Sequence, residues 1–121
     1  MKKLVKIDAS CAVCAIKYVS GIDEDTVLRV CAVEGFEAGE GMEDDAWMAA
    51  ARQLGVRFRR VSLEPAVLSR FIKDHPKGLY FVGTVDHLFV IDNGIIFDPR
   101  CANPPGLKRT ITSAWRVLKR T

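Results

Sequence analysis

The feature that most constrains the fold is the dipeptide Asn93-Gly94, which stands between two short apolar runs at 88–91 and 95–97. Asn followed by Gly readily adopts the positive φ values that a two-residue type I′ turn requires. If these two residues form the loop, Asp92 lies opposite Ile95 and Val90 lies opposite Phe97. The sequence therefore predicts a tight antiparallel hairpin in this part of the chain.

The register of this hairpin decides which polar side chains share a face of the sheet. Opposed residues, and residues two apart on one strand, point to the same side. Phe89 then pairs with Asp98, and His87 is a diagonal neighbour of Asp98. Asp86 and Asp92 point to the other face unless a bulge shifts the register. The prediction is a histidine that a carboxylate can orient.

The rest of the chain reads as helices followed by strands. Ser10 is a good N-cap for a buried helix over 11–20, and Asp23 for a helix over 24–33. A third helix is predicted over 43–54, a half-buried strand over 56–61, and a short helix with Pro65 at its first position. The run 78–83 is predicted as a central strand, and the last segment fits strand better than helix. This order indicates an α+β fold in one domain, 1–121.

Composition limits the classes of protein that the chain can represent. It has 121 residues, 49% of them hydrophobic, and a net charge of +3, which alone does not argue for nucleic acid. No apolar run approaches the roughly 20 residues that cross a bilayer, and the first residues do not resemble a secretory signal. We expect a cytoplasmic protein without membrane association, in which the four cysteines do not form a disulfide framework.

Charge is unevenly distributed along the chain. The stretch 30–51 contains acids and no Lys or Arg, and the stretch from 99 to the end contains bases and no acid. Such polarity can steer a charged partner, but two solvated faces would give the same pattern.

Cys11 is the candidate nucleophile. At the first turn of a helix, unpaired N–H groups and the positive end of the dipole favour a thiolate. A nearby imidazole would activate it further, and the same N–H groups could stabilise an oxyanion. Cys11, His87 and Asp98 would then form a Cys-His-Asp triad. The simpler interpretation is that Cys11 is a small core residue.

A family resemblance supports the catalytic interpretation. The segment 10–16 (SCAVCAI), the segment 49–55 (AAARQLG), the strand that begins at His87 and the dipeptide Asp98-Pro99 occur in that order. Together they resemble the papain-like cysteine peptidases, closest to the bacteriocin-processing peptidases and their small bacterial and phage relatives. The resemblance covers roughly 10–99. It implies a papain-like fold, N-terminal helices on a small antiparallel sheet, a peptide or protein substrate and no cofactor.

The chain departs from the family pattern at two positions. Ser10 precedes the cysteine where the family usually has Asp, and Val5 stands where the family has the Gln that completes the oxyanion hole. The chain's one glutamine is Gln53. Since loss of one oxyanion donor costs on the order of a hundredfold or more in rate, a catalytically weak or inactive protein-binding module is the alternative function.

Two further hypotheses concern the remaining cysteines and histidines. Cys14 is a rival nucleophile, and the resemblance gives it a small packing position. The Cys11-x-x-Cys14 spacing also suggests redox or zinc chemistry, but the βαβ context and a second paired ligand motif are missing. His75, before Pro76, is interpreted as a cation at a helix C-terminus. The sequence specifies neither the oligomeric state nor the cleavage specificity.

Overall fold

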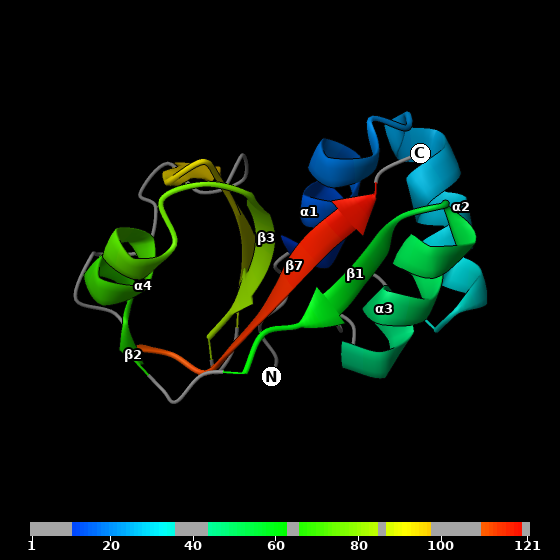
Figure 1. Cartoon of the computed structure of the whole chain (residues 1–121). Helices are drawn as coiled ribbons and strands as arrows, with labels where there is room; N and C mark the ends of the chain where they lie inside the picture. Colours follow the sequence, from blue (N-terminus) through cyan, green and yellow to red (C-terminus); the bar gives the residue numbers. More distant parts are fainter. Residues whose placement is uncertain (1–10, 36–43, 63–65, 85–86, 98–109, 120–121) are drawn as a thin grey trace. The chain divides into compact units, whose positions relative to one another are not determined.

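The computed structural model describes residues 11–35, 44–62, 66–84, 87–97 and 110–119, and only the backbone of Cys11, Ala66 and Lys119. The chain divides into two compact units, residues 1–57 with 119–121, and residues 58–118. Helices make up the first unit, and strands with one short helix make up most of the second (Figure 1). The predicted α+β class is confirmed.

The first unit contains α1 (Cys11–Ser20), α2 (Glu24–Val33) and α3 (Asp44–Gln53), each packed against the other two. The first two helices have the predicted bounds. The third ends at Gln53, one residue before the predicted end, and its predicted first residue, Glu43, lies outside the described residues. The buried side chains of this unit are Ala12, Val13, Ala15, Ile16, Val19, Val27, Cys31, Trp47, Ala50, Ala51, Leu54 and Val56. Removal of this apolar surface from water stabilises the three-helix arrangement.

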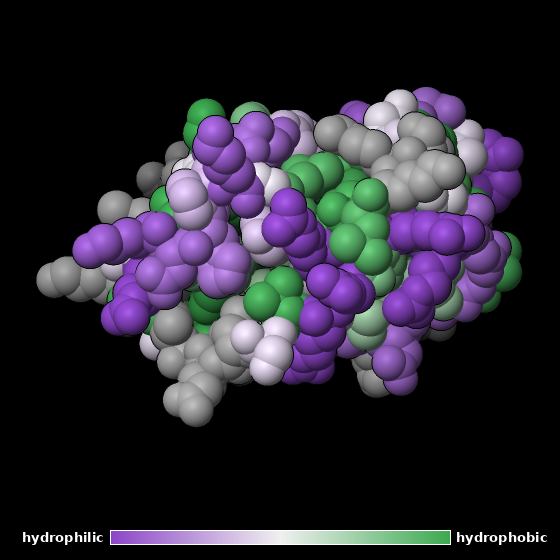
Figure 2. All heavy atoms as spheres, in the orientation of Figure 1, coloured by the Kyte–Doolittle hydropathy of each residue, from purple (hydrophilic) through white to green (hydrophobic). Residues whose placement is uncertain are grey.

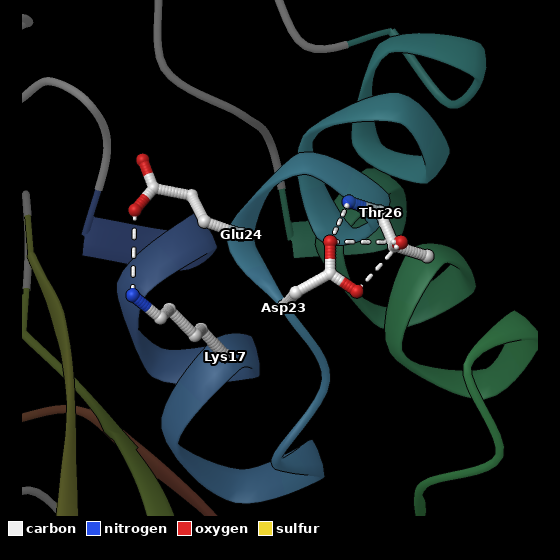
Figure 3. Close-up of polar contacts among 4 residues, drawn as sticks. All are labelled: Lys17, Asp23, Glu24 and Thr26. Carbon is white, nitrogen blue, oxygen red and sulfur yellow. Dashed lines mark hydrogen bonds and ion pairs between the residues drawn. The ribbon is translucent and has the colours of Figure 1, made fainter.

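Helix α1 is buried on most of its surface, as predicted. Its one charged residue, Lys17, is exposed and lies 3.4 Å from the Glu24 carboxylate of α2 (Figure 3). The helix ends at Gly21, which has a φ of 73° and whose N–H donates to the Lys17 carbonyl. Glycine adopts this left-handed conformation without steric cost, so it ends the helix cleanly.

Asp23 caps α2, as predicted. Its carboxylate accepts a hydrogen bond from the Thr26 backbone N–H at 3.0 Å and also from the Thr26 hydroxyl (Figure 3). These hydrogen bonds, the backbone one first, lower the pKa of Asp23 from its ordinary value of 3.8.

The Asp23 cap predicts a specific dependence of stability on pH. Because the folded-state pKa lies below the unfolded one, the stabilisation is complete above pH 3.8 and is lost as the pH falls through the folded-state pKa. Asp23→Ala should lower the melting temperature at neutral pH, and the difference from the unmodified protein should shrink in acid. Asp23→Asn is the control, because asparagine still caps the helix but does not titrate. Equal melting temperatures for the alanine variant and the unmodified protein at pH 7 would contradict the prediction.

The second unit is built on a five-stranded sheet with the order β1-β7-β3-β4-β5. Its strands are β1 (Arg57–Arg60), β7 (Ser113–Lys119), β3 (Leu79–Gly83), β4 (Leu88–Asp92) and β5 (Ile95–Phe97). Strand β3 pairs antiparallel with both β7 and β4, and β4 pairs antiparallel with β5. The predictions that 78–83 is a central strand and that the last segment is a strand are confirmed.

A second, two-stranded sheet corrects one sequence prediction. Strand β2 (Ala66–Val67) pairs antiparallel with β6 (Thr110–Ile111), and α4 (Leu68–Asp74) begins only after β2, with Val67 at its N-cap. The prediction that Pro65 occupies the first position of this helix is therefore wrong, and Pro65 itself lies outside the described residues. Pairing with a strand some forty residues later, which no local propensity reveals, keeps 66–67 extended.

Both faces of the sheet are apolar and buried at its central strands β3 and β4. On one face, α4 packs on the sheet through a cluster comprising Leu68, Phe71, Tyr80, Val82, Phe89, Ile91, Ile111 and Ala114. On the other face, Phe81 lies between Val90 and Trp115 of the neighbouring strands and packs edge-to-face on Phe58, with ring centroids 5.6 Å apart. Such burial on both sides accounts for the continuous apolar run of β3.

Candidate functional site

Cys11 is the first residue of α1, as the sequence predicts. A cysteine at this position stands among backbone N–H groups that have no partner within the helix, at the positive end of the dipole. Both effects favour the thiolate. The predicted N-cap Ser10 and the side chain of Cys11 lie outside the described residues. The structural support for an activated thiol is therefore the position of the Cys11 backbone in the first turn of α1.

The other cysteines of the first unit differ in environment. Cys14 lies one helical turn after Cys11 and is half-buried. Cys31 in α2 is fully buried, and this burial raises the pKa of its thiol to about 11. A neutral thiol in an apolar core is a poor nucleophile, so Cys31 has a packing role. Cys101 lies outside the described residues.

His87 immediately precedes β4 and is half-buried. Its backbone carbonyl accepts a hydrogen bond from the Thr84 N–H at 2.9 Å, which closes the connection between β3 and β4. Its imidazole stacks on the Phe89 ring, with centroids 5.8 Å apart and an interplanar angle of 26°. Phe89 is buried in the core, so the His87 ring packs against a buried aromatic side chain at the start of β4.

The hairpin that should bring a carboxylate to His87 has the predicted register. Val90 pairs with Phe97 and Asp92 pairs with Ile95. Asn93 and Gly94 have φ values of 51° and 83°, as a type I′ turn requires. Asp98, predicted to pair with Phe89, and Asp86, predicted to point to the other face, both lie outside the described residues. The position of the carboxylate stays a prediction.

Cys11 and His87 belong to different compact units. The structure supports the local position of each, the thiol at a helix start and the imidazole at a strand start, and their pairing stays a prediction. Val5, in the place of the expected oxyanion-hole glutamine, lies outside the described residues. Gln53 is the last residue of α3 and its side-chain amide donates to Glu34, so it is engaged in an exposed helix–helix contact.

His75 packs against buried aromatic residues of the second unit. It follows α4, its Nδ1 lies 3.2 Å from the Phe71 carbonyl, and its ring stacks on Phe71 with centroids 4.3 Å apart. It also meets the Tyr80 ring edge-to-face. These contacts explain a histidine at this position without a catalytic role.

Within the described residues, no group of three or more His, Cys, Asp or Glu side chains is placed to hold a metal ion. No helix among them has the length and apolar character needed to cross a bilayer.

Comparison of the chain with models of protein families, with curated proteins and with solved structures gives no match.

Proposed function

We propose that the chain is a papain-like thiol hydrolase that cleaves a peptide or amide bond. In this proposal Cys11 is the nucleophile, His87 is the general base and then the general acid, and Asp98 orients the His87 ring. The observation that carries the proposal is the start of buried helix α1 at Cys11 itself. The His87–Phe89 stack and the register of β4 with β5 support it.

The proposed reaction follows from the chemistry of these groups. The Cys11 thiolate attacks the carbonyl carbon, and the resulting oxyanion accepts hydrogen bonds from N–H groups at the start of α1. His87 gives its proton to the leaving amine, which departs and leaves the acyl group on Cys11 as a thioester. Water, deprotonated by His87, then attacks the acyl carbon and releases the acid and the free cysteine. No cofactor takes part.

The alternative function is a papain-like protein-binding module without catalysis. The observation that favours it is the absence of a glutamine near the start of the chain, since Val5 stands in the expected place and Gln53 bonds to Glu34. The proposed setting for either function, which rests on the family resemblance, is the cytoplasm of a bacterial or phage-infected cell.

Selective alkylation tests the proposed nucleophile. At about pH 6, well below the ordinary thiol pKa of roughly 8.5, iodoacetamide reacts mainly with activated thiolates. Peptide mass spectrometry should show Cys11 labelled at least tenfold faster than Cys14 or Cys101. Cys31 should be slowest, because burial raises the pKa of its thiol to about 11.

A matched pair of variants makes this experiment specific. His87→Ala should remove the preference for Cys11, and His75→Ala, which changes the other histidine of the chain, should leave it intact. Thermal melting of each variant separates loss of activation from unfolding. Equal labelling of Cys11, Cys14 and Cys101 in the folded unmodified protein would rule out the enzyme and leave the binding module.

A further inference from the structure

Two arginines face each other on the exposed surface of the second unit. The Val61 N–H donates to the Ala114 carbonyl at 2.8 Å, which in an antiparallel ladder makes these two residues a directly opposed pair. The arrows of β1 and β7 run in opposite directions in Figure 1. Arg59 is two residues before Val61 on β1, and Arg116 is two residues after Ala114 on β7. Because the strands are antiparallel, Arg59 lies opposite Arg116, and both are exposed.

This arrangement is electrostatically unfavourable for the isolated sheet. Like charges in directly opposed positions destabilise a strand pair. Within the described ranges, no acidic side chain forms an ion pair with either arginine. In Figure 2 the visible surface over β7 and β1 carries hydrophilic side chains beside a patch of hydrophobic ones. A local conflict of this kind is expected where a surface serves binding rather than stability.

Neighbouring residues hold one of the two guanidinium groups in place. The Arg116 guanidinium lies over the Tyr80 ring, 5.8 Å from its centroid. A Cβ added at Gly78 would approach the Arg116 Nη2 to 3.4 Å, so the glycine leaves room for this orientation. A guanidinium supported on an aromatic face loses less freedom when it binds a ligand.

We propose that the Arg59–Arg116 pair is a docking surface for an acidic peptide segment, whose carboxylates accept hydrogen bonds from the two guanidinium groups. Side chains directly opposed across two strands have Cβ atoms about 5 Å apart, so one or two carboxylates can contact both arginines. The chemistry of the partner is thus defined by charge complementarity. This surface is independent of the proposed thiol chemistry, which uses none of its residues.

The size of the basic surface favours a peptide over nucleic acid. Proteins that bind duplex DNA through its backbone typically contact about 6–10 phosphates, and single-strand binders add exposed aromatic rings for stacking. Here the opposed pair and Arg57, which is exposed two residues before Arg59 on the same face of β1, supply three cations, and the neighbouring Tyr80 and Trp115 rings are buried. A few carboxylates match this surface better than a polyphosphate backbone.

Fluorescence anisotropy with a labelled deca-glutamate peptide at low ionic strength tests the proposal. Arg59→Gln and Arg116→Gln should each weaken binding about fivefold, the double variant about twentyfold, and added salt should reduce binding. The matched control is Arg60→Gln, which removes the same charge one residue away. Arg60 is exposed but points to the opposite face, where its guanidinium lies over Trp115. Its replacement should change affinity less than twofold.

Other outcomes would overturn the proposal. These are no binding to the folded unmodified protein, an equal loss in the Arg59 and Arg60 variants, and tighter binding of a single-stranded DNA decamer through the same two arginines. Self-association that the double variant abolishes would identify a second copy as the occupant. Because removal of a like charge relieves repulsion, Arg59→Gln should melt no lower than the unmodified protein, and this excludes unfolding as the cause of lost binding.

Discussion

Replacing Phe81 with alanine is expected to lower the free energy of unfolding by about 4 kcal/mol, since truncation of a buried aromatic residue typically costs about 3–5 kcal/mol. Phe81 is fully buried on central strand β3, between Val90 and Trp115, with its ring against Phe58. The substitution removes apolar contact and leaves a cavity that backbone hydrogen bonds on both sides of the strand keep from collapsing.

Urea unfolding followed by fluorescence measures this loss. Ile95→Ala is the matched control, because Ile95 lies in edge strand β5 with 61% of its surface exposed. Its replacement should change the free energy of unfolding by no more than about 0.5 kcal/mol. A cost below about 1 kcal/mol for Phe81→Ala would mean that this face of the sheet is not tightly packed.

The second large effect concerns catalysis. If the proposed function is correct, Cys11→Ala should reduce hydrolysis of a fluorogenic peptide-amide library by at least about a thousandfold, because the covalent route is lost. Asp98→Asn should also reduce the rate strongly, since the imidazole loses the group that orients it. Initial rates of fluorescence release measure both effects.

Cys14→Ala is the control for this experiment. Cys14 lies one turn after Cys11 on the same helix, and its replacement should leave the rate within about threefold, since it takes no part in the proposed chemistry. The reverse result, activity lost with Cys14 and kept with Cys11, would make Cys14 the nucleophile. No hydrolysis by the folded unmodified protein would favour the binding module.

Local sequence signals predicted the elements that depend on short-range interactions. The bounds of α1 and α2 follow from the Gly21 stop and the Asp23 cap, which act within one turn. The hairpin register follows from Asn93 and Gly94, because positive φ at both positions permits one tight turn. The apolar run 79–82, with a glycine on each side, predicted that β3 is buried.

Local sequence patterns did not predict the contacts between residues that are far apart in the chain. The pairing of β2 with β6 brings together residues more than forty positions apart and moves the start of α4 to Leu68. The sequence predicted a half-buried strand over 56–61, but not which strand would lie beside it. The opposition of Arg59 and Arg116 was therefore missed.

By itself, the sequence determined where α1 and α2 begin and end, how the β4–β5 hairpin is paired, and that Cys11 is the first residue of a buried helix. Only the tertiary structure decided the strand order β1-β7-β3-β4-β5, the second small sheet, and the meeting of two arginines across β1 and β7. Caps and turns are fixed by hydrogen bonds and dihedral preferences within a few residues. Strand neighbours are chosen by burial and pairing over the whole chain, which no short window of residues encodes.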